Sequence, residues 1–502
     1  MFIKIYNVMK RYLIEIIILI PVIIILINTL FIYPIIGKCD NGDFERLFLY
    51  GGLSNLCNNY SEIYDGFVHI HYLISSPNIF LIFLLFYKNW VSGSILLKVA
   101  VVISLLVNNF SSNIFDIRYL AFVYSAIFTL SIFLILSFKR FSILLKLLAG
   151  IYIILIFTDT SYISYFNSFF GEAGTIVFFF LSIGTYLMLI TKNNPEIRYF
   201  VYFFAASAVF LTSKAQEIPL FVFMIIVYIG LFIYYRDKKC RKCIMISSLV
   251  VFILCGISYI SLTDRMNQNN MYQAVFSGIL RGSENPEKDL EELGLNKKFI
   301  VFYGKSFYNK NSNGDPLGKD MMEQFYPNIS PIKILCFYLK HPDRMWQKIQ
   351  DSAMNAYSFY IPGKWNFAKG EYSTNKNINT FRTKLISRYP KLHHNIYIFI
   401  LFSTVYICVV MIYLIKRKDK TTRLILLMLI FILAAGSSQF ILPVIGSGHG
   451  DFGKHLFLLN LCYDTMFGIS LLWCLSIIVK LLSYGITMCT GSQKIKKFKK
   501  NC

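Results

Sequence analysis

The stretch TDTSYISYFNSFFGEAG, residues 158–174, lies where one long apolar run stops and the next begins. A connection between two membrane spans needs only to be soluble, and a few Ser or Lys residues would suffice. This one instead gathers Asp159, Tyr165, Asn167 and Glu172. Carboxylates, a carboxamide and tyrosines at a bilayer surface favour a site for a polyhydroxylated ligand. The alternative is an interfacial belt of aromatic residues with polar neighbours that have no function.

The composition around this stretch indicates a membrane protein. The chain has 502 residues, of which 56% are hydrophobic and 15% are charged. Apolar runs long enough to cross about 30 Å of hydrocarbon recur along most of its length. Backbone polar groups in lipid must be satisfied within each helix, so we predict an all-α polytopic membrane protein. The net charge of +23 is explained by Lys and Arg in short loops on one side, and we predict no nucleic-acid partner.

The apolar runs predict about twelve transmembrane helices. Between them, basic loops alternate with loops that hold most of the carboxylates, and both termini are basic. The positive-inside rule places the basic loops and both termini in the cytoplasm. The predicted spans are residues 12–36, 73–88, 94–110, 119–138, 141–158, 174–191, 198–213, 217–235, 244–262, 396–415, 423–443 and 456–486.

This pattern divides the chain into three parts. Residues 1–262 form an N-terminal transmembrane module of about nine spans with an outer-loop active site. Residues 263–395 form one extracytoplasmic soluble domain of mixed or irregular structure, with a helical stretch at 332–356. Residues 396–502 form a C-terminal module of about three spans with a basic cytoplasmic tail.

Two outer loops carry candidate acids and bases. The segment KCDNGDFER, residues 38–46, follows the first span and contains Asp40 and Asp43. Such a carboxylate could take a proton from an acceptor hydroxyl or bind a cation, although a solvated loop start is the alternative. Asp116 and Arg118 stand two positions apart at the entry to the fourth span and do not face each other on a helix. The alternative for Arg118 is a snorkelling interfacial side chain.

Two further outer turns carry cations. In SKAQE, residues 213–217, Lys214 goes against the charge rule and is a candidate to bind a phosphate or an anionic headgroup. In GSGHGDFGKH, residues 446–455, Asp451, Lys454 and His455 offer acid–base and phosphate-binding groups, with a flexible polar loop as the alternative. In a compact bundle these turns would converge on an outward-facing site at the lipid boundary. That site suits a substrate with a lipid tail and a sugar or phosphate head.

Several of these segments resemble a known family. An Asp just after the first span is a hallmark of the GT-C glycosyltransferase superfamily. Within it, the chain resembles the bacterial WsfD-like group of hexose transferases. The resemblance rests on YFNSFFGE (165–172), SKAQEIPL (213–220), GILRGSENPEKDLEELGL (278–295), FYLKHPDR (337–344) and HGDFGKHLFLLN (449–460).

The resemblance implies a GT-C-like fold in a bacterial cell membrane, a polyprenyl-phosphate sugar donor, and a glycan or other envelope acceptor. It implies transfer on the extracytoplasmic face with inversion at the anomeric carbon. Asp40 or Asp43 would be the catalytic base, with Asp40 slightly preferred. Lys214 and Lys454 would hold the donor phosphate, with Arg118 or His455 assisting. The residues that it implies for substrate binding are Asp159, Tyr165, Asn167, Glu172, Arg118, Lys214, Gln216, Asp451, Lys454 and His455.

Other functions remain open from the sequence. A surface-polysaccharide polymerase or ligase would rely on Arg and His of the large outer loop. A lipid-linked sugar flippase would carry charges along a path at mid-membrane, and few are seen in the predicted spans. A non-catalytic scaffold of an envelope complex is a third alternative. No cofactor is certain; a divalent cation could lie between the loop carboxylates, although no spacing requires one.

Overall fold

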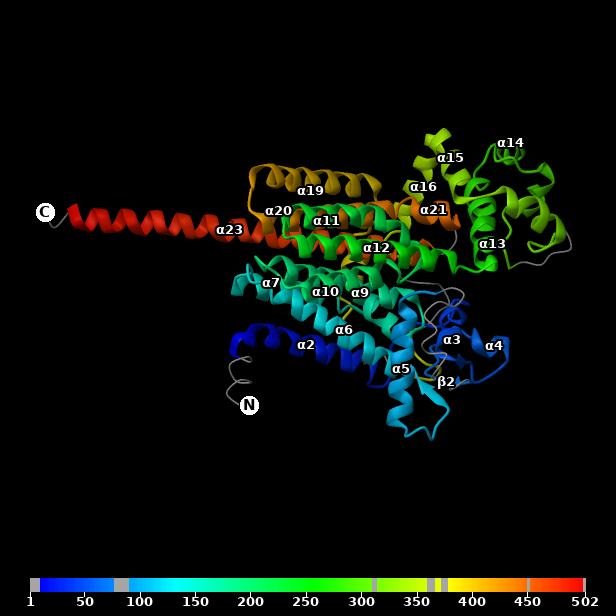
Figure 1. Cartoon of the computed structure of the whole chain (residues 1–502), viewed down its shortest axis with the longest axis horizontal. Coiled ribbons are helices and arrows are strands. Elements are labelled where there is room, and N and C mark those ends of the chain that lie inside the picture. Colours follow the sequence, from blue (N-terminus) through cyan, green and yellow to red (C-terminus); the bar gives the residue numbers. More distant parts are fainter. Residues whose placement is uncertain are drawn as a thin grey trace.

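The chain folds into a bundle of long helices that carries a helical domain at one end (Figure 1). This computed structural model describes residues 10–75, 90–308, 314–358, 366–371, 378–448 and 452–499. Within those ranges, 8 helices are long and apolar enough to cross a membrane. They are α2 (Leu13–Leu30), α6 (Arg118–Leu136), α9 (Gly171–Ile190), η3 with α11 (Ala215–Leu220 and Phe221–Tyr234), α12 (Lys238–Ile260), α19 (Ile396–Lys416), α20 (Lys420–Ser438) and the first part of α23 (Phe457–Lys499).

Two further apolar elements run along the bundle. One is α10 (Ile197–Leu211), and the other is a bent pair in which α7 (Ile143–Ile156) meets α8 (Thr160–Ile163) and η2 (Ser164–Asn167) at 63°. The bend coincides with Asp159, whose side chain accepts a hydrogen bond from the backbone N–H of Ser161. An Asp at this position caps a new helix start, so the chain changes direction here instead of continuing α7.

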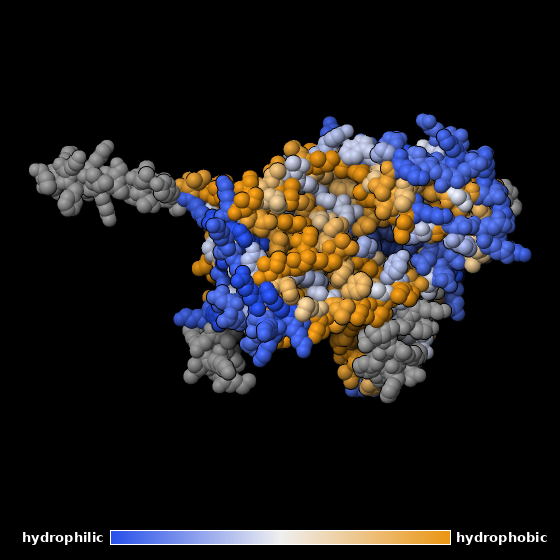
Figure 2. Space-filling view, turned by 45° about the horizontal axis from the view of Figure 1, so that its top comes forward, coloured by the Kyte–Doolittle hydropathy of each residue, from blue (hydrophilic) through white to orange (hydrophobic). Residues whose placement is uncertain are grey.

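The bundle has two polar ends separated by an apolar belt (Figure 2). One end carries the basic connections at residues 139–140, 192–198, 236–242 and 416–423, and we call it the basic end. The opposite end carries the helical domain and the connections rich in carboxylates, and we call it the domain end (Figure 1). An apolar belt between polar ends is what a multi-pass membrane protein requires.

Of the two spans predicted within residues 73–110, only the second is described in full by the structure, and it lies differently from the expectation. Residues 76–89 lie outside the described ranges, but the start of the first predicted span belongs to strand β2 (His71–Ile74). Strand β2 pairs antiparallel with β1 (Leu53–Ser54) and β3 (Ile114–Asp116) at the domain end. The second predicted span forms helix α5 (Gly93–Val107), which runs across the other helices at the domain end instead of along them (Figure 1).

Hydrogen bonds explain why α5 starts at the domain end. The backbone N–H of Trp90 donates to Ser261 Oγ at 2.9 Å, and that of Ser92 donates to the carbonyl of Thr212 at 2.9 Å. Ser261 and Thr212 end two spans, α12 and α10, so the start of α5 is fixed beside them. The apolar helix that predicted a span instead packs on α3 (Glu45–Gly51) and on α6.

The domain predicted at 263–395 consists of short helices joined by turns. The helical stretch predicted at 332–356 is confirmed as two helices that break at His341. Its buried core includes residues from α21 (Leu442–Ser447) and from the ends of α19 and α23, so it packs continuously onto the bundle. Its elements are α13 (Asp264–Tyr272), η4 (Gln273–Ile279), α14 (Pro286–Glu292), η5 (Lys297–Phe302), η6 (Met321–Phe325), η7 (Tyr326–Asn328), α15 (Pro331–Lys340), α16 (Pro342–Asn355), α17 (Phe381–Arg388) and α18 (Pro390–His393).

A buried ion pair ties this domain to the last span. Arg382 on α17 is 1% exposed, and its Nε donates to Asp464 Oδ2 on α23 at 2.5 Å. Tyr162 donates to the same oxygen at 2.6 Å, and the guanidinium lies 4.5 Å from the centre of the Tyr162 ring. The pair therefore holds α17, α23 and the bent turn after α7 together.

We predict that Arg382→Met lowers the free energy of unfolding by about 3–5 kcal/mol, because it leaves the Asp464 carboxylate buried without its cation. The double variant Arg382→Met/Asp464→Leu should recover much of that loss, since it removes the stranded charge. Thermal unfolding of the purified protein in detergent measures both changes. A double variant no more stable than the single variant would contradict this role of the pair.

Candidate active site

Four connections that are far apart in the sequence meet at the domain end. They are the first loop at 38–46, the turn at 159–172, the turn at 213–217, and the loop at 446–455, of which 449–451 lie outside the described residues. We call the polar side chains that they bring together the convergent cluster. Its members are Lys38, Asp40, Asp43, Glu172, Lys214, Gln216, Lys454 and His455.

Lys454 joins the loop at 446–455 to the loop at 38–46. Its Nζ contacts Asp43 Oδ2, and Arg46 Nη2 lies 2.8 Å from the other oxygen of that carboxylate. The Lys454 ammonium also lies 4.5 Å from the centre of the Phe170 ring. Burial lowers the pKa of Lys454 to about 7, although the charge of Asp40 acts in the opposite direction. Near neutral pH this side chain can therefore exist with or without its charge.

Asp40 is held in place by the backbone of its own loop. Its Oδ1 accepts hydrogen bonds from the N–H of Gly42 at 2.8 Å and of Phe44 at 3.2 Å, and the residue is 6% exposed. Gly42 has φ +100°, a conformation that glycine adopts without strain. Phe44 packs edge-on against Phe170, with ring centres 4.8 Å apart. The carboxylate is thus fixed beside Lys454 by a turn that the sequence DNG favours.

Glu172 and Lys214 form a second ion pair within the cluster. Lys214 Nζ lies 2.8 Å from Glu172 Oε1, and Glu172 is fully buried at the start of α9. A Cβ on the preceding Gly171 would lie 2.6 Å from Lys214 Cγ, so glycine makes room for the lysine stem. Glu172 Oε2 has no hydrogen-bond partner among the described residues. A buried carboxylate oxygen is costly to leave in that state, so it is a candidate acceptor for a ligand hydroxyl.

Gln216 and His455 bind each other. Gln216 Nε2 donates to the carbonyl of His455 at 2.7 Å and to Gln439 Oε1 at 2.6 Å, and His455 Nδ1 lies 3.1 Å from Gln216 Oε1. Burial, followed by the charges of Lys214, Lys454 and Arg46, lowers the pKa of His455 well below its usual 6.5. His455 is therefore neutral at pH 7, and it can offer a hydrogen bond but no charge to a phosphate.

Lys38 is a member of the cluster that the sequence analysis did not single out. Its ammonium lies 5.2 Å from the centre of the Tyr165 ring. Burial lowers the pKa of Lys38 to about 8, while Cys39, Asp159 and Glu172 act in the opposite direction. The sequence could have identified Lys38 by the same rule as Lys214, because each is a lysine in a connection on the side that has few basic loops.

Asp159 and Asn167 lie beside the cluster and make contacts within the protein. Both oxygens of Asp159 are engaged, because Thr383 donates to them through its Oγ1 at 2.8 Å and its N–H at 3.1 Å. Asn167 Nδ2 donates to the carbonyls of Leu30 at 2.9 Å and Ile36 at 2.8 Å. These contacts fix α17 and the exit of the first span; a direct role in sugar binding stays a prediction for both residues.

Arg118 pairs with Asp116, contrary to the expectation that they do not face each other. Asp116 ends strand β3 and is not helical, so Arg118 Nε can reach its two oxygens at 3.0 and 2.9 Å. The guanidinium lies 5.7 Å from the centre of the Tyr33 ring. None of these contacts brings Arg118 to Lys214, Lys454 or His455 within the described part of the chain. Its predicted assistance at a phosphate is therefore without geometric support.

The remaining predicted residues are Tyr165 and Asp451. Tyr165 is buried and packs edge-on against Phe457, with ring centres 5.0 Å apart, and against Phe170 at 6.0 Å. It forms the wall between the turn at 159–172 and the start of α23. Asp451 lies outside the described residues.

Arg382 and Asp464, described above, are the other polar residues that the sequence analysis missed. Asp464 stands within a predicted span, and Arg382 lies in the irregular domain about 80 residues earlier, so no local pattern connects them.

The described residues do not form a cluster of metal ligands. No group of three or more His, Cys, Asp or Glu side chains within the described ranges is placed to hold a metal ion. Asp43 instead faces two cationic side chains, Lys454 and Arg46.

The contact between Asp43 and Lys454 can be tested through stability. We predict that Asp43→Asn and Lys454→Met are each destabilising, and that the double variant loses less than the sum of the two. Contacting charged groups typically show a coupling of about 0.5–3 kcal/mol. Thermal unfolding of the four proteins measures it, and Arg198→Met with Glu196→Gln is the matched control, because that ion pair is exposed. Additive losses at Asp43 and Lys454 would mean that the two side chains do not interact.

Comparisons with known proteins place the chain in a family. Among solved structures, it is similar to the archaeal oligosaccharyltransferase AglB from Archaeoglobus fulgidus in complex with an inhibitory peptide and a dolichol-phosphate, with 12% identity and a TM-score of 0.41. That similarity covers 95% of this chain and 52% of AglB, so the chain spans about half the length of that protein. No curated protein sequence matches. The resemblance to the WsfD-like group is not confirmed. The model of the YfdI N-terminal transmembrane domain matches residues 3–497, and the chain therefore belongs to that family.

Proposed function

We propose that this membrane protein is a GT-C-type glycosyltransferase that moves a hexose from a polyprenyl-phosphate donor to a glycan or other envelope acceptor. The observation that carries the proposal is the convergent cluster, in which Asp43 of the first loop meets Lys454 of the last loop, and Glu172 meets Lys214. A transfer of this kind needs a base for the acceptor and cations for the departing phosphate. Both lie together at one end of an apolar bundle, where a lipid-linked donor would present its head.

The charge distribution supports an orientation. The connections at 139–140, 192–198, 236–242 and 416–423 gather Lys and Arg at the basic end, which by the positive-inside rule would face the cytoplasm. The domain end would then face outward, in a bacterial cell membrane. Lipid-linked sugars exposed on that face would reach the convergent cluster from the outer leaflet.

We assign the base to Asp40 and a counter-ion role to Asp43. Asp43 already contacts Lys454 and Arg46, so its oxygens are engaged with cations. Asp40 is fixed by two backbone N–H groups on one oxygen and lies close enough to Lys454 to influence its charge. The donor phosphate would replace Asp43 as the partner of Lys454.

The proposed transfer is a single displacement at the anomeric carbon of the hexose. The acceptor hydroxyl gives its proton to Asp40 while its oxygen attacks the anomeric carbon. The bond from that carbon to the phosphate oxygen breaks, and the electron pair leaves with the polyprenyl phosphate. Lys454 and Lys214 stabilise the negative charge on the leaving phosphate. Attack from the face opposite the phosphate inverts the anomeric centre.

Glu172 supplies a contact for the sugar in this proposal. Its Oε1 is held by Lys214, and its Oε2 has no partner within the described residues. A hexose hydroxyl that donates to Oε2 would satisfy that oxygen and place the anomeric carbon near the lysine that receives the phosphate. Tyr165 would form the apolar wall against which the ring lies.

We predict that Asp40→Asn lowers kcat for hexose transfer by about 10²–10⁴-fold, the range typical of losing a general base. Asp43→Asn should change the donor KM more than kcat, because it alters the partner of Lys454. Asp65→Asn is the matched control, since Asp65 is another carboxylate of the same outer loop and bonds to the N–H of Phe67. The measurement is transfer of labelled hexose from a panel of polyprenyl-phosphate donors by protein in lipid nanodiscs.

The same assay decides between the proposal and its alternatives. If Asp40→Asn transfers hexose as fast as the wild type, Asp40 is not the base. Equilibration of lipid-linked sugar across the bilayer without transfer would identify a flippase. Extension of a glycan by whole repeat units, with no dependence on Asp40 or Asp43, would identify a polymerase or ligase.

We also predict that the donor KM rises with pH above about 7. The pKa of Lys454 lies at about 7, so its charge is present below this pH and is lost above it. The phosphodiester of the donor keeps one negative charge throughout this range, and each further pH unit can weaken its binding up to about tenfold. Lys454→Arg keeps a positive charge at all these values, so its KM should stay flat.

Asp43 contacts Lys454 and the charge of Asp40 acts on it, while Lys454, Lys214 and Arg46 all act on His455. Donor KM measured from pH 6 to pH 9 in the wild type and in Lys454→Arg tests the assignment. An equal rise in both proteins would mean that another group, such as Lys38, controls donor binding.

A further inference from the structure

A second basic region lies at the domain end, away from the convergent cluster. Residues 378–395 lead from the domain into α19 and contain four Lys or Arg residues and no Asp or Glu: Arg382, Lys384, Arg388 and Lys391 carry the charge. Arg382 is buried against Asp464, whereas Lys384, Arg388 and Lys391 are exposed. A basic segment next to a span at the end with fewer basic loops goes against the usual charge pattern. An anionic partner at this position would explain it.

A cavity of about 580 Å³ lies at this segment. Its walls come from Gln350 and Met354 of α16, Lys391 of α18, and Ile396 and Tyr397 at the start of α19, with His394 between the last two helices. None of the described residues that line it is Asp or Glu. Its mixture of one ammonium, several hydrogen-bonding groups and apolar side chains suits a ligand with an anionic head and an apolar body.

The surroundings place the cavity at the edge of the apolar belt. Trp346 lies 6.2 Å from Tyr397 between ring centres, and Tyr389 is 45% exposed nearby in the sequence. Aromatic residues of this kind gather at the membrane–water interface. Directly below, Ile400 and Leu401 on α19 are 43% and 65% exposed. The cavity therefore opens where headgroups and the first carbons of acyl chains would lie.

The start of α19 adds to the attraction for an anion. Asn395 caps this 21-residue helix by accepting a hydrogen bond from the N–H of Tyr397. The other N–H groups of the first turn have no acceptor within the helix and point out of its N-terminal end. Their partial positive charge favours a phosphate. Burial lowers the pKa of His394 below its usual 6.5, so its ring contributes hydrogen bonding at neutral pH while Lys391 contributes the charge.

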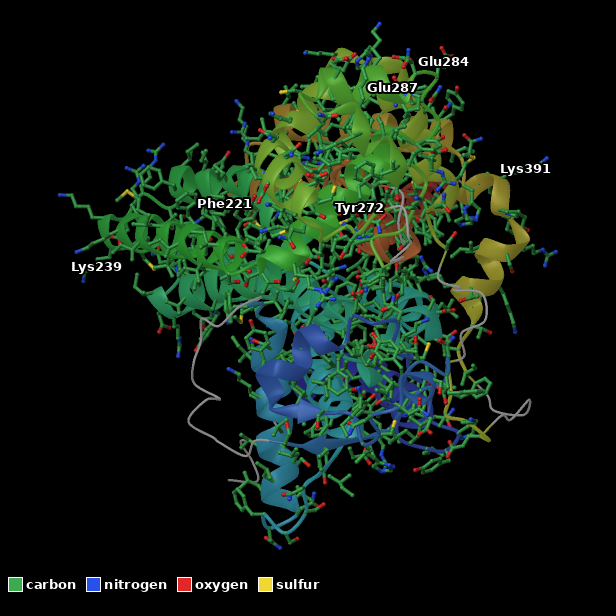
Figure 3. The ribbon with its side chains drawn as sticks, turned by 90° about the vertical axis from the view of Figure 1, so that its right-hand side faces the viewer. Phe221, Lys239, Tyr272, Glu284, Glu287 and Lys391 are labelled. Atoms are coloured by element: carbon green, nitrogen blue, oxygen red, sulfur yellow. The ribbon has the colours of Figure 1, made fainter. Side chains whose placement is uncertain are left out.

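We propose that this cavity binds the phosphate headgroup of an anionic glycerophospholipid, whose acyl chains lie along the exposed face of α19. Lys391 pairs with the phosphate, and Gln350 and His394 are within the walls that receive the rest of the headgroup. The site shares no residue with the convergent cluster. Figure 3, which looks onto the domain end, shows Lys391 at the edge of the molecule, with its side chain reaching outward. It is thus a lipid site in addition to the proposed donor site.

Native mass spectrometry of the purified full chain tests the proposal. The protein is incubated with phosphatidylglycerol, with phosphatidylcholine, or with inorganic phosphate alone, and the retained ligand is counted. Lys391→Gln removes the charge in the cavity. Lys384→Gln is the matched control, because it makes the same change on an exposed lysine of the same segment that does not line the cavity. Both lysines are exposed, so neither variant disturbs the core.

We expect the wild type and Lys384→Gln to retain phosphatidylglycerol, and Lys391→Gln to retain at least about fivefold less, which corresponds to about 1 kcal/mol. Phosphatidylcholine, whose net charge is zero, should be retained less than phosphatidylglycerol by the wild type. Equal retention of phosphatidylglycerol by all three proteins would overturn the proposal. Retention of inorganic phosphate that depends on Lys391 would also overturn it, because it would identify free phosphate as the ligand. No outcome depends on hexose transfer.

Discussion

The contact between Lys454 and Asp43 is the constraint on which the domain end depends. It joins the loop before α23 to the loop after α2, and the other spans lie between these two loops in the sequence. Two buried like charges would repel, and a single buried charge would be costly, so the two loops can approach only as a pair of opposite sign. The same rule governs Glu172 with Lys214, which brings the start of α9 to the end of α10. The convergent cluster is therefore assembled by charge pairing across connections that share no local sequence.

The sequence predicted much of this arrangement, because membrane spans and their polar turns are local features. The apolar runs identified the long helices. Of the five polar turns expected to converge, four meet in the convergent cluster, and no described contact brings the turn with Arg118 to it. Apolar content does not distinguish a helix that runs along the bundle and spans the membrane from one that lies across the end of the bundle. For that reason α5 was predicted as a span. Asp464 and Arg382 could not be linked, because their pairing depends on the packing of α17 onto α23.

The domain end combines two chemically different surfaces. The convergent cluster is enclosed, and its buried lysines have pKa values lowered toward neutrality, which makes their charge responsive to a bound phosphate. The cavity at the start of α19 is open to the rim, and Lys391 is exposed there. A lipid held at that rim would stabilise the junction of the domain and α19, whereas a lipid-linked donor would enter beside the first loop. The buried side chains of the convergent cluster suit catalysis, whereas the open cavity at the start of α19 suits the binding of a lipid headgroup.

The most direct test of the account is a cryo-electron microscopy structure of the protein in nanodiscs with a polyprenyl-phosphate hexose bound. The account predicts that the phosphate lies between Lys454 and Lys214, that Lys454 has moved from Asp43 to the phosphate, and that Asp40 faces the anomeric carbon from the opposite side. A donor bound elsewhere, with the contact between Lys454 and Asp43 unchanged, would contradict it.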